Sequence, residues 1–161
     1  MDTRNLFETR TTYRLLRLEY GLGLIVTAAA FIDHISEVRW IPAIILFAYI
    51  DVIGYLPGLI TYHRTPGRHV PKVYYVLYNT MHSLAVQGLV VLAWIWWLGF
   101  EWALLVVPLH LFGDRALLGN FLKPFAVSFE PKAHPAYTGL RQALETSSKA
   151  TGEHRQPEVA A

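Results

Sequence analysis

Four long apolar stretches constrain this chain more than any other feature. They cover the ranges 13–32, 40–62, 73–98 and 102–121, and short polar or turn-forming segments separate them. A bilayer core about 30 Å thick needs about 20 apolar residues in a helix, so each stretch is long enough to cross it. Hydrophobic residues make up 53% of the 161 residues. The sequence therefore predicts an all-α, polytopic membrane four-helix bundle rather than a soluble domain.

The distribution of Lys and Arg predicts the orientation of the bundle. Basic residues precede the first stretch, fill the 63–72 loop and follow the middle of the fourth stretch, whereas the other side carries Arg39 alone. Because cytoplasmic loops are enriched in Lys and Arg, both termini are predicted to be cytoplasmic. Residues 1–127 form the predicted transmembrane domain. Residues 128–161 form a polar cytoplasmic tail, with one short helix at 137–144 and disorder after 146.

Ionisable and polar side chains inside the apolar stretches are the second constraint. Such groups cost a few kcal/mol each at membrane depth and usually face the bundle interior. At 1.5 Å per residue, seven of them lie roughly 9 to 16 Å from the cytoplasmic end of their own stretch. Spacings of three and four residues place partners on one face of a helix. The pattern predicts one shared polar centre in the cytoplasmic half, built from Glu19, Asp51, Tyr55, Asn79, His82, His110 and Asp114.

Histidines and carboxylates that project inward from several helices are typical of a metal site in a helical bundle. The chain contains no cysteine, so the ligands would be imidazoles and carboxylates, a set that suits iron, manganese or zinc. The predicted metal ligands are Glu19, Asp51, His82, His110 and Asp114.

Further polar residues are predicted to support these ligands. Tyr55 and Asn79, together with Ser83, are expected to contact the ligands or the substrate. Arg115 and Arg17 lie closer to the headgroups, where they would neutralise carboxylates or hold an anionic substrate head. We expect Tyr55, Asn79 and Arg115 to take part in catalysis. The alternative is that the buried His, Asp and Arg side chains pair with one another and only fix the helix register.

Short motifs in all four stretches resemble a family of small bacterial membrane proteins, the domain of unknown function numbered 4260. The resemblance covers about residues 15–123. It implies a bacterial inner-membrane location but no reaction. The 62–72 loop is longer and more basic here, and residues 119–124 replace a Gly-Tyr-Gly-like ending. The motifs are Leu15-Leu16-Arg17-Leu18-Glu19, Asp51-x-x-Gly54-Tyr55-Leu56, Tyr78-Asn79-x-x-His82 and His110-x-x-x-Asp114-Arg115.

Three classes of function remain open at this point. The first is a membrane enzyme that acts on a lipophilic small molecule, either an iron oxidoreductase or a zinc hydrolase. The second is a non-catalytic subunit of a larger complex, or an anchor that binds ions or a haem b through His82 and His110. The third is a metal-free acid/base isomerase. Expected partners are the lipid bilayer and other protein subunits or copies of this chain. Nucleic acid is not expected, because no basic run is interleaved with exposed aromatics.

Overall fold

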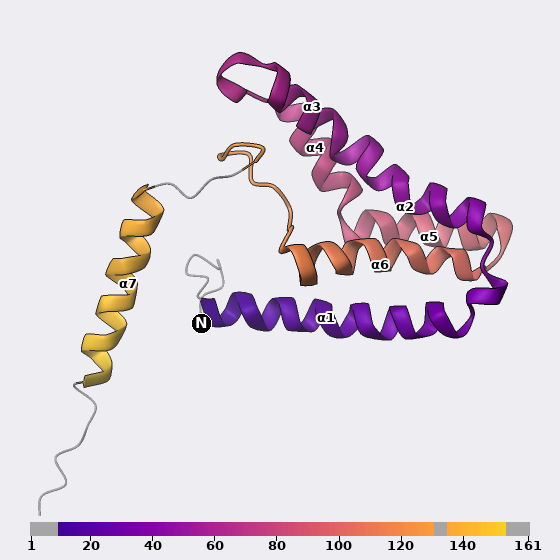
Figure 1. Cartoon of the computed structure of the whole chain (residues 1–161), viewed down its shortest axis with the longest axis horizontal. Helices are drawn as coiled ribbons and strands as arrows, with labels where there is room; N and C mark the ends of the chain where they lie inside the picture. The colour runs from indigo at the N-terminus through magenta and orange to yellow at the C-terminus, as the bar shows by residue number, and fades with distance from the viewer. Residues whose placement is uncertain (1–9, 131–134, 154–161) are drawn as a thin grey trace, which may run out of the picture. The chain divides into compact units, whose positions relative to one another are not determined.

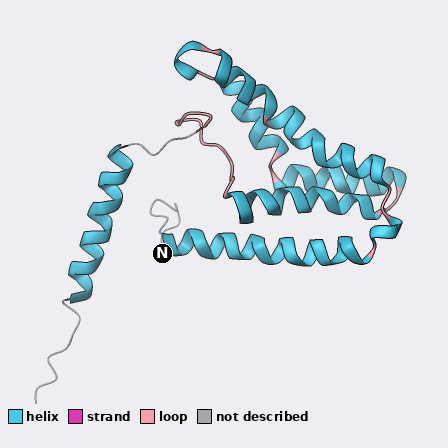
Figure 2. Cartoon of the chain, viewed as in Figure 1, coloured by secondary structure: helices cyan, strands magenta, loops and turns pink. Residues whose placement is uncertain are grey.

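The computed structural model describes residues 10–130 and 135–153, and every regular element in these ranges is a helix (Figures 1 and 2). The chain divides into two units, Met1–Phe129 and Glu130–Ala161. The first unit holds all of the polar residues singled out above. Its α-helices are α1 (Arg10–Asp33), α2 (Trp40–Gly54), α3 (Leu56–Arg64), α4 (Lys72–Met81), α5 (Leu84–Leu98) and α6 (Val106–Gly113). Its shorter elements are the 3-10 helices Ile35–Glu37, Pro66–Arg68 and Trp102–Leu105 and the π-helix Asp114–Leu118.

Two helices are long and apolar enough to cross a membrane: Arg10–Asp33 with 24 residues and Trp40–Arg64, which joins α2 and α3, with 25. A third is obtained when α4 and α5 are taken as one span bent by 55°. The fourth apolar stretch is different, because it consists of a four-residue 3-10 helix, the eight-residue α6 and a five-residue π-helix. The all-helical fold and two or three membrane-length helices are therefore established, and the four-span bundle stays a prediction.

Packing in the first unit centres on α6. α1 runs alongside α6 and the π-helix that continues it (Figure 1), while α2 packs against α4 and α6. The outward face of α1 exposes its large apolar side chains, as expected for a surface that meets lipid. These are Leu15, Leu18, Leu22, Ile25, Val26 and Ile32. The core between α2 and α6 is aliphatic and consists of Val38, Ala43, Leu46, Ile50, Ala103, Leu104, Val106, Val107 and Leu111.

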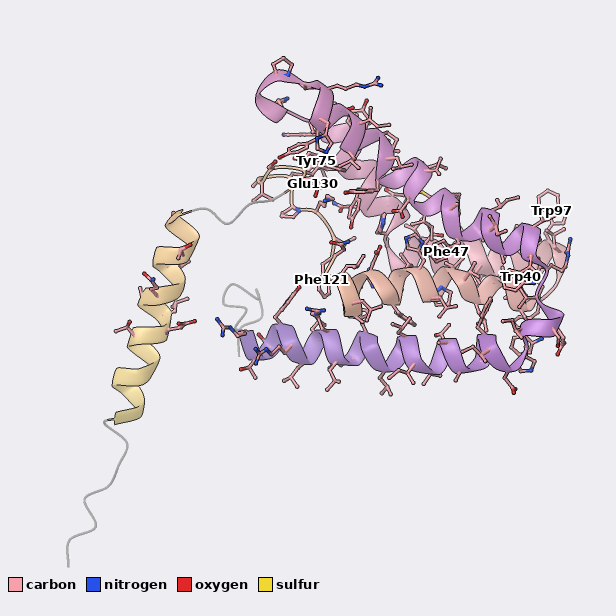
Figure 3. The ribbon with its side chains drawn as sticks, viewed as in Figure 1. Trp40, Phe47, Tyr75, Trp97, Phe121 and Glu130 are labelled. Carbon is pink, nitrogen blue, oxygen red and sulfur yellow. The ribbon has the colours of Figure 1, made fainter. Side chains whose placement is uncertain are left out.

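Residues 119–129 form a loop that returns from the π-helix to α3 and α4, where Tyr75 lies beside it (Figure 3). The loop ends in Phe129, whose side chain is fully buried against Gly58. The Tyr75 hydroxyl donates a hydrogen bond to the Val127 carbonyl at 2.8 Å. A side chain at position 58 would overlap the Phe129 ring, so a glycine is required at this contact.

The loop also carries a cation into an aromatic cluster. The Lys123 ammonium lies 5.6, 4.8 and 4.5 Å from the ring centres of Tyr55, Tyr78 and Phe129, and it donates a hydrogen bond to the Phe129 carbonyl at 2.6 Å. Aromatic faces attract a cation at these distances. We call these four residues the Lys123 cluster.

The second unit contains one helix, α7 (Pro135–Glu153), with 19 residues. It begins at a proline, which is preorganised for the first helical position. The predicted short helix at 137–144 is therefore too short, and the disorder predicted after 146 is wrong as far as Glu153. Residues 154–161 lie outside the described residues.

Candidate metal centre

Three helices end or change type where the predicted polar side chains meet. α2 ends at Gly54, one turn after Asp51, and His82 and Ser83 separate α4 from α5. α6 passes into a π-helix that begins at Asp114. Helix breaks and π-segments are frequent at functional sites because they re-aim side chains and free backbone groups for new partners.

Side chains bind the backbone groups that the α4–α5 break leaves without a helical partner. Gln87 Nε2 donates to the Met81 carbonyl at 2.9 Å, and Arg115 Nη2 donates to the His82 carbonyl at 2.9 Å. The Ser83 hydroxyl accepts the Val86 N–H at 3.4 Å and caps α5. Inside a bilayer such groups have no water to pair with, so these bonds are what makes the break stable.

Four side chains from three elements converge at these breaks. His82 Nε2 lies 3.3 Å from Asp51 Oδ1 and 3.4 Å from Asp114 Oδ2. His110 Nε2 lies 3.6 Å from Asp51 Oδ2 and 3.6 Å from Asp114 Oδ2. Each imidazole therefore faces both carboxylates, and each carboxylate faces both imidazoles. We call these four residues the His/Asp centre.

Both imidazoles are oriented by backbone carbonyls. His82 Nδ1 lies 3.0 Å from the Tyr78 carbonyl, and His110 Nδ1 lies 3.0 Å from the Phe47 carbonyl. Because a carbonyl oxygen can only accept a hydrogen bond, each Nδ1 carries the proton. In the neutral ring this leaves the Nε2 lone pair directed at the carboxylates. A histidine that donates its other N–H to a carbonyl is the usual arrangement of a metal ligand.

The distances in the His/Asp centre are compatible with a central ion as well as with His–Asp ion pairs. A charge-assisted hydrogen bond between an imidazolium and a carboxylate is about 2.7–2.9 Å long. Ligand atoms held about 2.0–2.2 Å from a tetrahedral ion stand about 3.3–3.6 Å apart. The four N–O distances fall between 3.3 and 3.6 Å. Asp51, His82 and His110 also each offer a ligand atom within 4.8 Å of the other two, so this group could hold a metal ion.

The centre is closed except at Asp51. The side chains of His82 and His110 are 6% and 4% exposed and that of Asp114 is 15% exposed, whereas Asp51 is 45% exposed. Phe47, one turn before Asp51 on α2, lies against the His110 ring with 4.6 Å between ring centres (Figure 3). A ligand would reach the centre most directly beside Asp51 and Phe47.

One aromatic ring joins the His/Asp centre to the Lys123 cluster. The Tyr78 ring stacks on the His82 imidazole with 4.0 Å between ring centres and 13° between planes. The same residue accepts the His82 Nδ1–H on its backbone carbonyl. Tyr78 therefore holds both the plane and the rotation of the His82 ring.

No family model, curated protein or solved structure matches this chain. The resemblance to the family of unknown function numbered 4260 stays a prediction, and any inference to function rests on the His/Asp centre.

The structure does not bring every predicted residue to this centre. Glu19 is exposed on α1, because it lies about 200° around the helix from Arg17, which faces the π-helix. Asn79 pairs instead with the backbone of Lys123, donating to its carbonyl at 2.9 Å and accepting its N–H at 2.7 Å. Tyr55 belongs to the Lys123 cluster. Arg115 lies next to the centre through its bond to the His82 carbonyl.

Sequence reasoning did not single out Gln87, and it quoted Tyr78 and Gly54 only as parts of motifs, without a role in the centre. Gln87 is the one amide in the apolar run of α5, and that polarity was a usable signal. It is 1% exposed and accepts a hydrogen bond from the Tyr49 hydroxyl. Gly54 lets α2 approach the α4–α5 break, since a Cβ there would lie 2.7 Å from Met81 Cβ and 3.3 Å from His82 Cε1.

Proposed function

We propose that this chain is a membrane-embedded, metal-dependent enzyme that acts on a lipophilic substrate at the His/Asp centre. The observation that carries the proposal is the spacing of two oriented imidazoles and two carboxylates by 3.3–3.6 Å. That donor set suits iron, manganese or zinc. A bound iron would supply oxidation chemistry, and a bound zinc would supply Lewis-acid hydrolysis.

The chain's own residues would position the ion and the substrate. His82 and His110 present fixed Nε2 atoms, and Asp114 closes the buried side of the centre. Asp51 leaves the exposed side open for substrate. Burial of both imidazoles limits the access of water to them, which strengthens electrostatic interactions with the reacting group. Arg115, which is anchored on the His82 carbonyl, would contact the substrate next to the ion.

The geometry speaks against the haem alternative. Two axial histidines need the porphyrin plane between them. Here carboxylates of Asp51 and Asp114 stand within 3.6 Å of both Nε2 atoms, in the space that a porphyrin would fill. The ring centres of His82 and His110 are 5.9 Å apart at an angle of 70°. A metal-free acid/base isomerase would use the same four side chains of the His/Asp centre. Metal analysis of the purified protein distinguishes this alternative from our proposal.

The proposal includes a bacterial inner-membrane location with four spans and both termini in the cytoplasm. The helices α1, α2–α3 and the bent α4–α5 pair would be three spans, and the path through α6 the fourth. Because the chain lacks cysteine, single cysteines can test this. A Ser36→Cys variant should react with an impermeant maleimide from the periplasm, and a Thr65→Cys variant only from the cytoplasm. The reverse pattern would contradict the proposed orientation.

Metal content of the purified protein tests the enzyme proposal. We expect about one equivalent of iron, manganese or zinc in the wild type, and less than about a tenth of that in His82→Ala and His110→Ala. His63→Ala is the control, because His63 is exposed in the last turn of α3. Wild-type protein that takes up none of the three metals on reconstitution would end the metal proposal. A Soret absorption band would instead indicate haem.

A further inference from the structure

Arg115 is a buried cation with one unused donor group. The residue is 7% exposed, its Nη2 donates to the His82 carbonyl, and the Tyr20 ring lies 4.8 Å from its guanidinium carbon. Its Nη1 is buried and has no hydrogen-bond partner. Within the described part of the chain, no ion pair involves Arg115. A buried, unpaired charged donor is costly and points to a missing partner.

Arg17 is a second arginine at the π-helix, and it makes more backbone hydrogen bonds than Arg115 does. Its Nε and Nη2 donate to the Ala116 carbonyl at 2.9 and 2.6 Å, and Nη2 also donates to the Leu117 carbonyl at 2.8 Å. Arg17 and Arg115 both lie at the π-helix, yet the more buried of the two, Arg115, has a single bond to a carbonyl. Of these two arginines, only Arg115 has an Nη1 that is both buried and without a hydrogen-bond partner.

A count of charges gives the sign of the missing partner. Asp51 and Asp114 carry two negative charges, which a divalent cation would balance while His82 and His110 stay neutral. Arg115 then leaves one positive charge beside the loaded centre. In a site of low dielectric constant this charge requires a counter-ion close by. A monoanion bound at Nη1 would supply it.

We propose that the loaded His/Asp centre binds the oxyanion head of an amphiphile, a carboxylate or a phosphate, with Arg115 Nη1 as the donor. This inference rests on the proposed function and names the substrate class for it. A guanidinium is suited to the task because its donors match the geometry of a carboxylate or phosphate. The apolar chain of the amphiphile would lie on the exposed side of the centre, beside Phe47 and Asp51.

Entry of the head requires a movement, because Nη1 is closed off in the present arrangement. The side chain that covers the guanidinium is Tyr20, on α1. Tyr20 also contacts the rings of Phe112 and Phe121, at 6.1 and 5.8 Å between centres. We expect the Tyr20 ring to swing away from Arg115 when the head binds, so Tyr20→Leu should speed binding without removing it.

Electron paramagnetic resonance of spin-labelled lipids tests the inference on full-length protein in neutral detergent, loaded with zinc. The probes are doxyl-stearic acid, its uncharged methyl ester and spin-labelled phosphatidic acid. We expect the wild type to bind the acid with at least tenfold higher affinity than the ester. Arg115→Gln should abolish this preference, Arg115→Lys should keep part of it, and the control Arg17→Gln should keep all of it. Competition by inorganic phosphate separates a free anion from a lipid headgroup.

Metal analysis of the same samples separates the two proposals. Failure of the wild type to bind zinc defeats the proposed function, whatever the lipid result. If zinc is bound but the acid and the ester bind equally, the anion site is overturned. It is also overturned if Arg115→Gln keeps the preference for the acid while Arg17→Gln loses it. Should Arg115→Gln fail to fold, Arg115→Lys is compared with the wild type instead. If Arg115→Lys, which lacks the guanidinium, prefers the acid as strongly as the wild type does, the anion site is also overturned.

Discussion

The His/Asp centre and the Lys123 cluster are two buried charged regions joined by Tyr78, and they differ in how their charges are satisfied. In the Lys123 cluster the ammonium has a carbonyl at 2.6 Å and three aromatic faces around it. In the His/Asp centre the nitrogens and oxygens face one another at distances longer than good ionic hydrogen bonds. The first region is complete without any addition, and the second is not.

This difference indicates which of the two regions stabilises the fold and which could bind a ligand. Asn79 and Tyr75 tie the 119–129 loop to α4 in this region, and the Lys123 ammonium is bound by the Phe129 carbonyl. The centre gathers two carboxylates and two imidazole nitrogens at one point, beside an arginine whose Nη1 has no hydrogen-bond partner. We therefore expect changes in the Lys123 cluster to affect folding, and changes in the His/Asp centre to affect binding.

The largest effect should come from Phe129→Ala. Phe129 is fully buried, and removal of a buried aromatic side chain costs about 3–5 kcal/mol. We expect a corresponding loss in the free energy of unfolding, measured by denaturant titration in detergent, with zinc affinity of the remaining folded protein changed less than threefold. Phe125→Ala is the matched control, since Phe125 in the same loop is 51% exposed. A large drop in zinc affinity would contradict the expectation that the Lys123 cluster affects folding and not metal binding.

The next effect should come from Asp114→Asn, which keeps the size of the side chain and removes its charge. Loss of one charged ligand should weaken zinc binding by about a hundredfold or more, as measured by calorimetry. Stability without metal should change little or rise, because the repulsion between Asp51 and Asp114 is relieved. Unchanged zinc affinity would show that the carboxylate serves only to pair with the imidazoles.

Gln87→Leu should cost about 1–3 kcal/mol of stability, because it leaves the Met81 carbonyl and the Tyr49 hydroxyl without their partner. Thermal unfolding in detergent measures this. Gln87→Glu is a useful comparison, since it keeps the acceptor for Tyr49 but loses the donor for Met81. Equal stability of wild type and Gln87→Leu would mean that the α4–α5 break needs no side-chain support.

The smallest and most informative effect should come from Tyr78→Leu, at the joint between the two regions. Supports of a metal-bound histidine are worth about tenfold to a hundredfold in affinity. At His82 only the ring stacking is lost, because the backbone carbonyl remains, so we expect about tenfold in metal affinity. The variant also loses the ring contacts of Tyr78 in the Lys123 cluster, which should lower stability rather than metal affinity. Tyr78→Phe should restore the wild-type affinity. A cobalt(II) visible spectrum altered in Tyr78→Leu and normal in Tyr78→Phe would locate the effect at the metal.

Four residues of the centre could be predicted from the sequence, because the position of a residue along a helix is obtained by counting residues from its end. Asp51, His82, His110 and Asp114 were placed at similar depths in this way, and the structure brings them together. The direction in which a side chain points is harder to predict from the sequence, because it depends on the rotation of each helix about its axis. Glu19 has a suitable depth on α1 but points outward.

The break at His82–Ser83 could not be predicted from composition, since neither proline nor glycine marks it. The axes of α4 and α5 are bent by 55° at this break. Asn79 and His82 both precede α5, yet they have different partners. Asn79 meets the 119–129 loop and His82 meets the centre. The Lys123 cluster likewise depends on a long-range return of the chain that local patterns do not encode.

Gly54 links the helix backbone to the size of the centre. Since α2 already touches Met81 and His82 at this point, the gap between Asp51 and His82 is set by contact of backbone with side chain rather than by adjustable rotamers. A larger cation such as cadmium would therefore need Asp51 to move outward, because α2 and the α4–α5 break are already in contact at Gly54.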